Sequence, residues 1–263
     1  MKFQFAHELV LKTGRWLRDA VRNHAIDLQN KTSHQDIVTE YDKSTEEKIT
    51  AAIHGLFPDD VVIGEETWQG AAAAGNGVWY LDPIDGTSNF VSQRMNYAIS
   101  LGYYENGQAT FGLVYDVAAD VMYHAMAGQG AFRNGLQIHT AAERTELQDM
   151  LIYSPIVLET FHSEQPYGAA MQALAEQSRA VRSLGSLAIE LCLLAEGCAD
   201  IVASSRSMPW DYNAARVILN EAGGVLCNMS GEAIAPDYSG PILALSAKSL
   251  QDRLMEQYFK TKC

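Results

Sequence analysis

Long apolar runs are missing from this sequence of 263 residues. No window approaches the roughly 18 uncharged apolar residues that a membrane-spanning helix needs, so we expect no membrane span. The N-terminal stretch MKFQFAHELVLKTGRWLRDA is broken by charged residues and lacks the continuous apolar segment of a signal peptide. Apolar residues nevertheless make up 48% of the chain and charged residues 19%, which is typical of a globular protein.

Cysteine and positive charge are also scarce. The four cysteines show no CxxC spacing, so we predict buried thiols in a reducing, cytoplasmic compartment: Cys192, Cys198, Cys227 and Cys263. Lys and Arg number 19 against 32 Asp and Glu, which gives a net charge of −13. This acidity argues against nucleic acid as a partner. An acidic protein that binds an anion therefore needs a local source of positive charge.

The length of the chain corresponds to between one and two domains, at a prior of roughly 150 residues per domain. No internal repeat is evident, and the stretch from about 140 to 160 is not a convincing linker. We therefore predict one domain over residues 1–263, with subregions of roughly 1–145 and 146–263 packed as one unit.

The first half is predicted to begin with two helices and then to become rich in strands. Apolar spacing predicts a helix over 3–24, and a Thr39 cap followed by Asp42 predicts a second helix that ends near Phe57. The polar stretch Lys31–Gln35 and the small-residue stretch Ala71–Gly77 are predicted to be loops. Strands are expected at 61–63, 78–81, 97–104, 109–115 and 121–125, with an Asn-Gly hairpin turn at 106–107.

The second half alternates between the two kinds of element. Strands are expected at 151–153, 180–182, 199–203 and 242–245. Helices are expected at 167–178, 187–196, 212–222 and 249–259. This alternation favours a layered α/β fold.

Three acidic motifs stand at strand ends or helix starts, where strands bring side chains to a common edge. They are Gly64-Glu65-Glu66, Asp82-Pro83-Ile84-Asp85-Gly86-Thr87 and Trp210-Asp211. Alone, each also fits a structural alternative: a solvated strand end, a turn, and a helix N-cap. The functional interpretation depends on their occurring together.

Asp82 and Asp85 can converge across the turn that Pro83 stiffens, and without a cation they would repel each other. Mg²⁺ prefers carboxylates, carbonyls and water, and no His or Cys stands here at zinc-ligand spacing. Gly86 and Thr87 then supply backbone amides at an expected helix start, which suits an anion. Metal ligands beside an anion-binding turn predict a site of phosphate hydrolysis.

Further motifs accompany these: KTSHQDIVTEYD over 31–42, Ser88-Asn89-Phe90, RSLGS over 182–186, Tyr212-Asn213-Ala214-Ala215 and Glu221-Ala222-Gly223-Gly224. With them, essentially the whole chain resembles the inositol monophosphatase family. The resemblance implies an α/β fold of the layered α+β kind, an αβαβα sandwich of the inositol monophosphatase and fructose-1,6-bisphosphatase type. It also implies a Mg²⁺-dependent phosphomonoesterase that is inhibited by Li⁺ and is commonly a homodimer.

The resemblance also implies roles for individual residues. Glu65, Asp82 and the Ile84 carbonyl would hold a first Mg²⁺, while Asp82, Asp85 and Asp211 would hold a second, and Glu65 with waters would hold a third. Thr87, oriented by Asp42, would help to activate the attacking water, although a purely structural Thr87–Asp42 hydrogen bond is the alternative. Lys31 would lie on a mobile loop near the site. Phosphate and substrate would be bound by Asp85, Gly86, Thr87, Ser88, Gly185, Ser186, Ser204 and Asp211.

One position departs from the family pattern. Animal inositol monophosphatases have a Glu seven residues before the aspartate of the Trp-Asp motif, where it contacts inositol hydroxyls, and here that residue is Ser204. The chemistry is expected to be intact, but the substrate stays open between inositol phosphate, fructose 1,6-bisphosphate, a 3′-phosphoadenosine nucleotide and NADP(H), and broad specificity is a further alternative. A regulatory, protein-binding role is the remaining alternative. Arg206 nearby either meets a second anionic group or is solvated.

Overall fold

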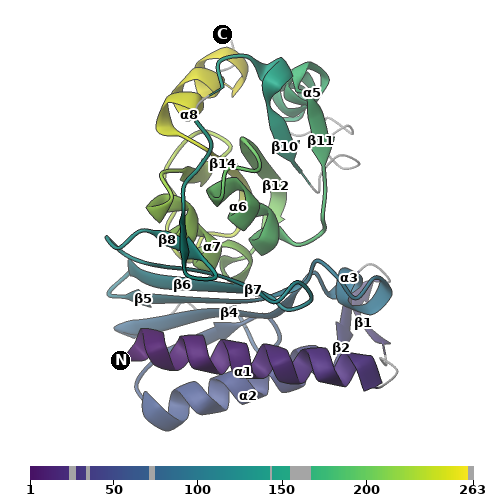
Figure 1. Ribbon diagram of the computed structural model, residues 1–263, viewed down its shortest axis with the longest axis vertical. Coiled ribbons are helices and arrows are strands. Elements are labelled where there is room, and N and C mark those ends of the chain that lie inside the picture. The colour runs from purple at the N-terminus through teal and green to yellow at the C-terminus, as the bar shows by residue number, and fades with distance from the viewer. Residues whose placement is uncertain (24–27, 34–35, 71–74, 143, 155–166, 260–263) are drawn as a thin grey trace.

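The computed structural model describes residues 1–23, 28–33, 36–70, 75–142, 144–154 and 167–259, and their elements stack in five layers (Figure 1). Helices α1 (Lys2–Asn23) and α2 (Glu40–Leu56) lie side by side against one face of a seven-stranded sheet. Helices α6 (Leu187–Ala195) and α7 (Pro209–Glu221) lie between this sheet and a five-stranded one. Helices α5 (Gly168–Gln177) and α8 (Lys248–Leu254) form the outer layer, so the predicted αβαβα sandwich is confirmed.

The larger sheet is antiparallel except at one edge, where β3 pairs with β4 in parallel. Its strand order follows the chain: β3 (Val61–Gly64), β4 (Gly77–Asp85), β5 (Ala98–Glu105), β6 (Gln108–Asp116), β7 (Val121–Met126), β8 (Ala131–Arg133) and β9 (Leu136–Ile138). Asn106 and Gly107 both have positive φ, so the predicted hairpin turn between β5 and β6 is confirmed.

The smaller sheet is mixed, and crossovers connect its strands. Its strand order is β11 (Ala180–Arg182), β10 (Leu151–Tyr153), β12 (Ile201–Ser207), β14 (Gly240–Leu245) and β13 (Val225–Asn228). Strand β12 pairs in parallel with β10 and antiparallel with β14, which places it at the centre of this sheet. The end of β12 therefore points toward the larger sheet, where the site described below lies.

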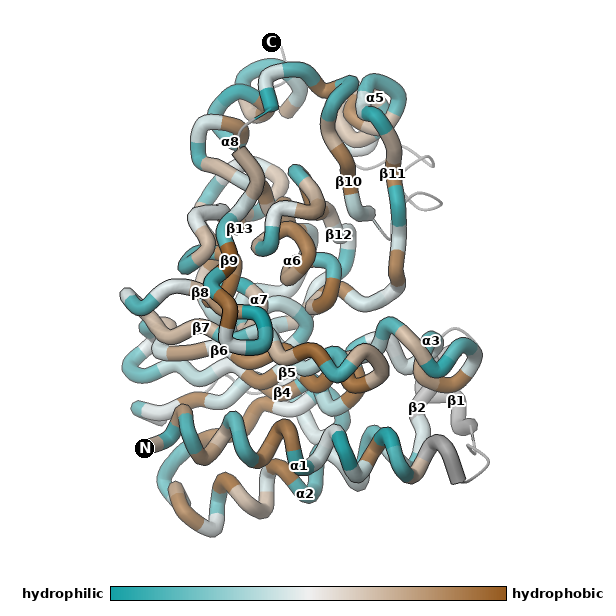
Figure 2. The backbone as a smooth tube through the Cα atoms, in the orientation of Figure 1, coloured by the Kyte–Doolittle hydropathy of each residue, from teal (hydrophilic) through white to brown (hydrophobic). Residues whose placement is uncertain are grey.

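One hydrophobic core joins the two sheets. Helix α6 has the sequence LAIELCLLA and is apolar on nearly every side, as Figure 2 shows, so it has to be buried all round. Helix α7 packs so closely on the larger sheet that two glycines are required there: a Cβ at Gly112 would lie 2.1 Å from the Ala214 carbonyl oxygen, and one at Gly102 would lie 3.0 Å from the Ala214 nitrogen. Because this core draws on both subregions, we propose that they fold as one unit.

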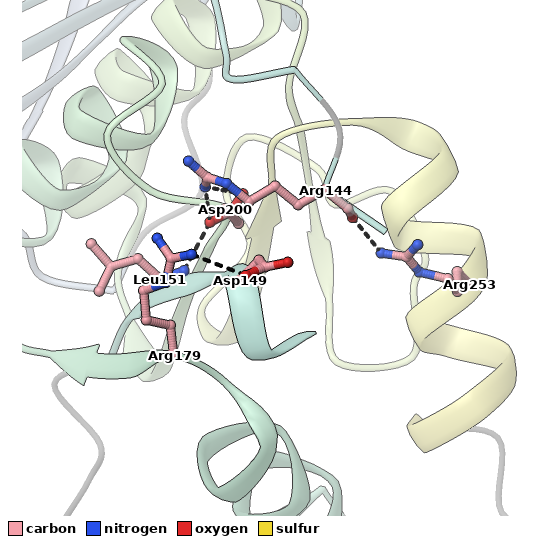
Figure 3. Close-up of polar contacts among 6 residues, drawn as sticks. All are labelled: Arg144, Asp149, Leu151, Arg179, Asp200 and Arg253. Carbon is pink, nitrogen blue, oxygen red and sulfur yellow. Dashed lines mark hydrogen bonds and ion pairs between the residues drawn. The ribbon is translucent and has the colours of Figure 1, made fainter. Parts of the chain in front are cut away.

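A buried carboxylate anchors the start of β12 (Figure 3). Asp200, which is 1% exposed, accepts hydrogen bonds from the Arg144 guanidinium and from the Leu151 backbone nitrogen at 2.8 Å. The Arg144 carbonyl in turn accepts a hydrogen bond from Arg253 on α8 at 2.9 Å. The segment around Arg144 links the two sheets, and these contacts attach it to both β10 and β12.

Several local predictions were wrong. Residues 31–33, predicted as a loop, belong to β1 (Leu28–Ser33), which pairs antiparallel with β2 (Asp36–Thr39), so Lys31 lies in a strand. Backbone pairing forms this hairpin despite its polar sequence, while residues 34–35 and 71–74 of the predicted loops lie outside the described residues. Cys192 and Cys227 are buried as predicted, but Cys198, just beyond the end of α6, is exposed, and Cys263 is not described.

Two boundaries near the site also differ from prediction. Strand β12 continues to Ser207 instead of ending at Ala203, and α7 begins at Pro209 instead of Tyr212. The polar run Ser204–Ser207 lacks the apolar pattern by which a strand is predicted from sequence. Pairing with β14 nevertheless continues there through an irregular register. Among the described residues, no helix is long and apolar enough to cross a membrane.

Candidate metal and phosphate site

A pocket of about 270 Å³ lies where the ends of β4 and β12 meet the first turns of α6, α7 and α3 (Thr87–Ser92). Most of the predicted site residues line it, although they come from distant parts of the chain. The lining consists of Glu65, Asp82, Ile84, Asp85, Gly86, Thr87, Gly185, Ser186, Leu187, Glu190, Ser204, Arg206 and Asp211. Asp42 lies behind Thr87, Ser88 is exposed on α3, and neither belongs to this lining.

A bulge in β4 turns two carboxylates toward the same space. Asp82 pairs with Ser100 and Asp85 with Ala98, so three steps along β4 correspond to two along β5. Residues three apart on a regular strand face opposite sides, and the extra residue of a bulge cancels that alternation. Pro83, which has no backbone N–H to donate to the ladder, lies within the bulge. Asp82 and Asp85 therefore both line the pocket.

The turn that carries Glu65 is held from α2. The Glu46 carboxylate accepts a hydrogen bond from the Glu66 nitrogen at 2.9 Å, and the Glu65 nitrogen donates to the Leu81 carbonyl at 3.2 Å. A Cβ at Gly64 would lie 2.4 Å from the Glu46 carboxylate, so this close approach requires glycine. The Gly-Glu-Glu motif thus fixes the backbone at the edge of the pocket.

Gly86 begins the phosphate-binding turn predicted from the sequence. Its φ of 87° lies in the left-handed region, and a Cβ would meet the Asn96 carbonyl oxygen at 2.9 Å. The next residue, Thr87, has its hydroxyl 3.1 Å from both the Asp42 carboxylate and the Ile84 carbonyl oxygen. The Thr87 hydroxyl can donate to only one of these at a time, and the predicted contact between Thr87 and Asp42 is present.

Asp42 has a structural task as well. Its Oδ2 accepts a hydrogen bond from the Thr39 nitrogen at 2.7 Å, which completes the capping box of α2. Burial raises the pKa of Asp42, although hydrogen bonds from Thr39 oppose that shift. Asp42 therefore caps α2 through Oδ2, while Oδ1 remains directed at Thr87.

Hydrogen bonds from residues in the second half of the chain fix the remaining two carboxylates, those of Asp85 and Asp211. Asp85 Oδ2 accepts hydrogen bonds from the Ser186 hydroxyl at 2.6 Å and from the Ala188 nitrogen at 2.7 Å, at the first turn of α6. Asp211, in the first turn of α7, accepts a hydrogen bond from the Met208 nitrogen at 2.8 Å. Both aspartates therefore use one oxygen to cap a helix start, as the structural interpretation of Asp211 anticipated.

The carboxylates are held in a costly electrostatic arrangement. Burial raises the pKa of Asp82 well above its usual value, and the charges of Glu65, Asp85 and Asp211 raise it further. Burial also raises the pKa of Asp85 to about 6, in spite of the hydrogen bonds from Ser186 and Ala188. Such repulsion between buried carboxylates is relieved when a cation binds between them.

The donor set suits Mg²⁺. The pocket offers carboxylate and carbonyl oxygens and no imidazole or thiol, which matches a hard cation. Among the described residues, no group of three or more acidic, His or Cys side chains is placed so that these side chains alone could hold a metal ion. Mg²⁺ usually keeps several waters and takes only a few protein oxygens, so an open arrangement of this kind still fits it.

Sequence reasoning missed one buried acid in the lining. Glu190 on α6 is 1% exposed, and its Oε1 accepts hydrogen bonds from the Leu184 and Gly185 nitrogens at 2.5 and 3.3 Å. Burial raises its pKa to about 7. A lone Glu in the otherwise apolar segment LAIELCLLA was the signal that could have identified it.

Comparisons with known proteins agree with this arrangement. The model of the inositol monophosphatase family matches residues 2–260. Inositol-1-monophosphatase of Bacillus subtilis is 34% identical, over 94% of this chain and 95% of its own. Fructose-1,6-bisphosphatase/inositol-1-monophosphatase of Thermotoga maritima is 33% identical, over 88% of this chain and 86% of its own.

The fold agrees in the same way. The crystal structure of inositol monophosphatase-II from Staphylococcus aureus superposes with a TM-score of 0.83 at 30% identity and covers 99% of this chain and 94% of its own. A match over nearly the full length, by sequence and by fold, establishes the relationship. The chain therefore belongs to the inositol monophosphatase family and is a phosphomonoesterase of that family.

Proposed function

We propose that this phosphatase releases inorganic phosphate from inositol monophosphate or a related small phosphorylated metabolite, in a reaction that requires Mg²⁺. One observation carries the proposal: a single small pocket collects five carboxyl groups, a Thr hydroxyl and a helix-opening turn, but only one positively charged side chain among the residues described there. Such a pocket would repel a phosphate by itself, and bound cations would reverse that repulsion.

Two Mg²⁺ ions would be held by Glu65, Asp82, the Ile84 carbonyl, Asp85 and Asp211, and a third, weaker ion by Glu65 and waters. When bound, Mg²⁺ supplies the charge that neutralises phosphate, lowers the pKa of water and stabilises a leaving oxygen. The buried position of Asp82 and Asp85 supports their role, because burial destabilises their charged forms and a bound cation would offset that cost.

The protein's own groups would orient the reacting partners. The Thr87 hydroxyl, 3.1 Å from the Asp42 carboxylate, would hold a water in line with phosphorus and pass a proton toward Asp42. The backbone amides of Gly86 and Thr87 would bind phosphate oxygens. Ser186 would act on Asp85, which it orients by hydrogen bonding, and Gly185 would shape the wall beside Gly86.

The substrate is the finer part of the proposal. Ser204 donates a hydrogen bond to the Arg206 carbonyl at 3.1 Å, so its hydroxyl is engaged locally. It is also too short to reach a polyol as a Glu would. Fructose 1,6-bisphosphate, 3′-phosphoadenosine 5′-phosphate and NADP(H) are therefore alternative substrates. The name of the Thermotoga relative includes a bisphosphatase, and a staphylococcal relative was crystallised with bound 2′-AMP.

Family membership also supports inhibition by Li⁺, a homodimer and a cytoplasmic location, which we include in the proposal. Light scattering on the purified chain tests the dimer, because a mass near 28.9 kDa would contradict it.

The test is phosphate release from inositol 1-phosphate and the alternative substrates, each with Mg²⁺, with EDTA and with added Li⁺. We expect release that requires Mg²⁺ and falls with Li⁺. Equal release in EDTA would contradict the metal assignment. Absence of release from all substrates, with Mg²⁺ still bound, would contradict this substrate class.

A further inference from the structure

Arg206 enters the pocket through a second bulge. On β12, Ser204 pairs with Ile242 and Ser207 pairs with Gly240, so three steps along β12 correspond to two along β14. Bulges of this kind bend a strand and redirect a side chain. The hydrogen bond from the Ser204 hydroxyl to the Arg206 carbonyl at 3.1 Å spans this bulge and holds it closed. Ser204 and Arg206, which are two apart on the strand, both line the pocket.

Arg206 is the positively charged side chain among the described residues of the lining, which also includes five carboxyl groups. Among the residues that the structure describes, its guanidinium has no ion-pair partner, and Arg206 is exposed at the pocket rim. The nearby acid Glu190 already uses one oxygen for the Leu184 and Gly185 nitrogens. A guanidinium left available in this way presents five N–H donors, in a planar fork that matches a phosphate or a carboxylate.

The lining combines groups of different character. The carboxylates of β4 and α7, with Thr87, suit the proposed metal ions and the transferred phosphate. The bulge of β12 and the start of α6 add Arg206, Ser204 and Leu187 to the same lining. Among the described residues of the lining, Arg206 is the side chain that would attract an anion on the alcohol part of the ester, whereas an uncharged polyol would not use its charge.

We propose that Arg206 binds a second anionic group of the substrate, a phosphate or a carboxylate carried on the alcohol part. The inference rests on the proposed phosphatase activity of the same pocket. It makes the preferred substrate a phosphomonoester with a further negative charge, in place of an inositol monophosphate whose other substituents are hydroxyls.

The test compares two substrate pairs that differ by the second anion. For phosphate, the pair is 3′-phosphoadenosine 5′-phosphate and adenosine 3′-phosphate, followed by chromatographic loss of the 3′-phosphate. For carboxylate, the pair is 2-phosphoglycerate and glycerol 2-phosphate. Each pair gives a ratio of kcat/KM, which is measured with Mg²⁺ for the wild type, Arg206→Ala, Arg206→Lys and a control, Arg179→Ala. The Arg179 side chain is 59% exposed and paired with Asp149 at the surface beside α5, so the substitution Arg179→Ala removes the same charge away from the pocket.

We expect the wild type to prefer the member with the second anion. In Arg206→Ala that preference should fall by about tenfold to a hundredfold, mainly through KM, because a charge-assisted bidentate contact is lost. Arg206→Lys should retain part of the preference, and Arg179→Ala should match the wild type. If the kcat/KM ratio falls for one substrate pair alone, the result supports the inference and identifies the second anion as phosphate or as carboxylate. Equal melting temperatures exclude misfolding as the cause.

Two results would overturn the inference. If the ratios of both pairs stay within about twofold in Arg206→Ala, Arg206 does not bind a second anion. An equal loss for both members of a pair leads to the same conclusion and would assign Arg206 to the transferred phosphate. Absence of phosphate release by the wild type from every substrate is a different failure, which overturns the proposed function and this inference with it.

Discussion

Replacing Asp85 with Asn removes the charge of this carboxylate and keeps its shape. Asp85 is 9% exposed, and burial raises its pKa from 3.8 to about 6. Ser186 and Ala188 both donate to Asp85 Oδ2, and the amide oxygen of Asn has two lone pairs that can accept both hydrogen bonds. The substitution should therefore remove most of the activity while it relieves electrostatic strain.

The size of the stability change depends on pH. A carboxyl group with a raised folded pKa destabilises the fold when it ionises, so the penalty is absent below about pH 4, grows up to about pH 6 and is constant above. At pH 7.5 the wild type without metal bears about 3 kcal/mol of this penalty, and the hydrogen bonds from Ser186 and Ala188 are already included in the raised pKa. Asp85→Asn should thus be about 3 kcal/mol more stable at pH 7.5, or roughly 6–12 °C in Tm.

At pH 4.5 the difference should shrink. The folded wild-type carboxyl group is then mostly protonated and its penalty is only about 1 kcal/mol, so the variant keeps an advantage of about that size, which vanishes below about pH 4. Saturating Mg²⁺ at pH 7.5 should stabilise the wild type by about 2.7 kcal/mol at a hundred times Kd, and should stabilise the variant much less.

The assay is thermal unfolding of both proteins in EDTA at the two pH values and with Mg²⁺ at pH 7.5, combined with phosphate release. Asp149→Asn, at an exposed surface pair, is the control for loss of a negative charge. Turnover near that of the wild type, or an equal rise in Tm with Mg²⁺ in both proteins, would refute the metal assignment. A variant several kcal/mol less stable than the wild type at pH 7.5 would refute the electrostatic reasoning.

Three other predictions concern specificity, pH and packing. Ser204→Glu should raise kcat/KM for inositol 1-phosphate relative to other esters, and an unchanged ratio would contradict our interpretation of that position. Burial lowers the pKa of His7 and of His124, whose rings lie 5.6 Å apart, so stability should fall as pH drops through about 6.5 toward the lower folded pKa values. His124→Phe should flatten that dependence in chemical denaturation, and a profile identical to the wild type would count against it. Gly112→Ala should lower the free energy of unfolding by more than about 1 kcal/mol, because its Cβ would meet the Ala214 carbonyl, whereas Gly55→Ala on α2, with open space around it, should be neutral or stabilising. Equal effects of the two glycine variants would contradict the packing of α7 on the sheet.

The acidic pocket could be predicted from the sequence because its residues stand at strand ends and helix starts. Asp82 and Asp85 follow a run of buried strand residues, and Asp211 opens a helix that Pro209 introduces. Such positions meet at one edge in layered α/β folds, so their convergence follows from topology. The sequence predicted that both carboxylates converge at a turn after Leu81, whereas β4 continues to Asp85 and brings them together through a bulge.

Other parts of the site could not be predicted, because long-range pairing decides them. The polar run Ser204–Ser207 has no alternating pattern, and only its register with β14 makes it a strand that brings Arg206 to the pocket. The same reason applies to the polar hairpin of β1 and β2, where Lys31 lies. Short strands such as β8 and β9 have too few residues for a periodic signal.

The most direct test of a metal site in this pocket is anomalous diffraction from crystals soaked with Mn²⁺, which takes the same oxygen ligands as Mg²⁺. We predict anomalous peaks between Glu65, Asp82, Asp85 and Asp211, and none in crystals of Asp85→Asn at the position that Asp85 shares. Peaks confined to other parts of the surface, in a protein whose phosphate release still requires the metal, would contradict the account.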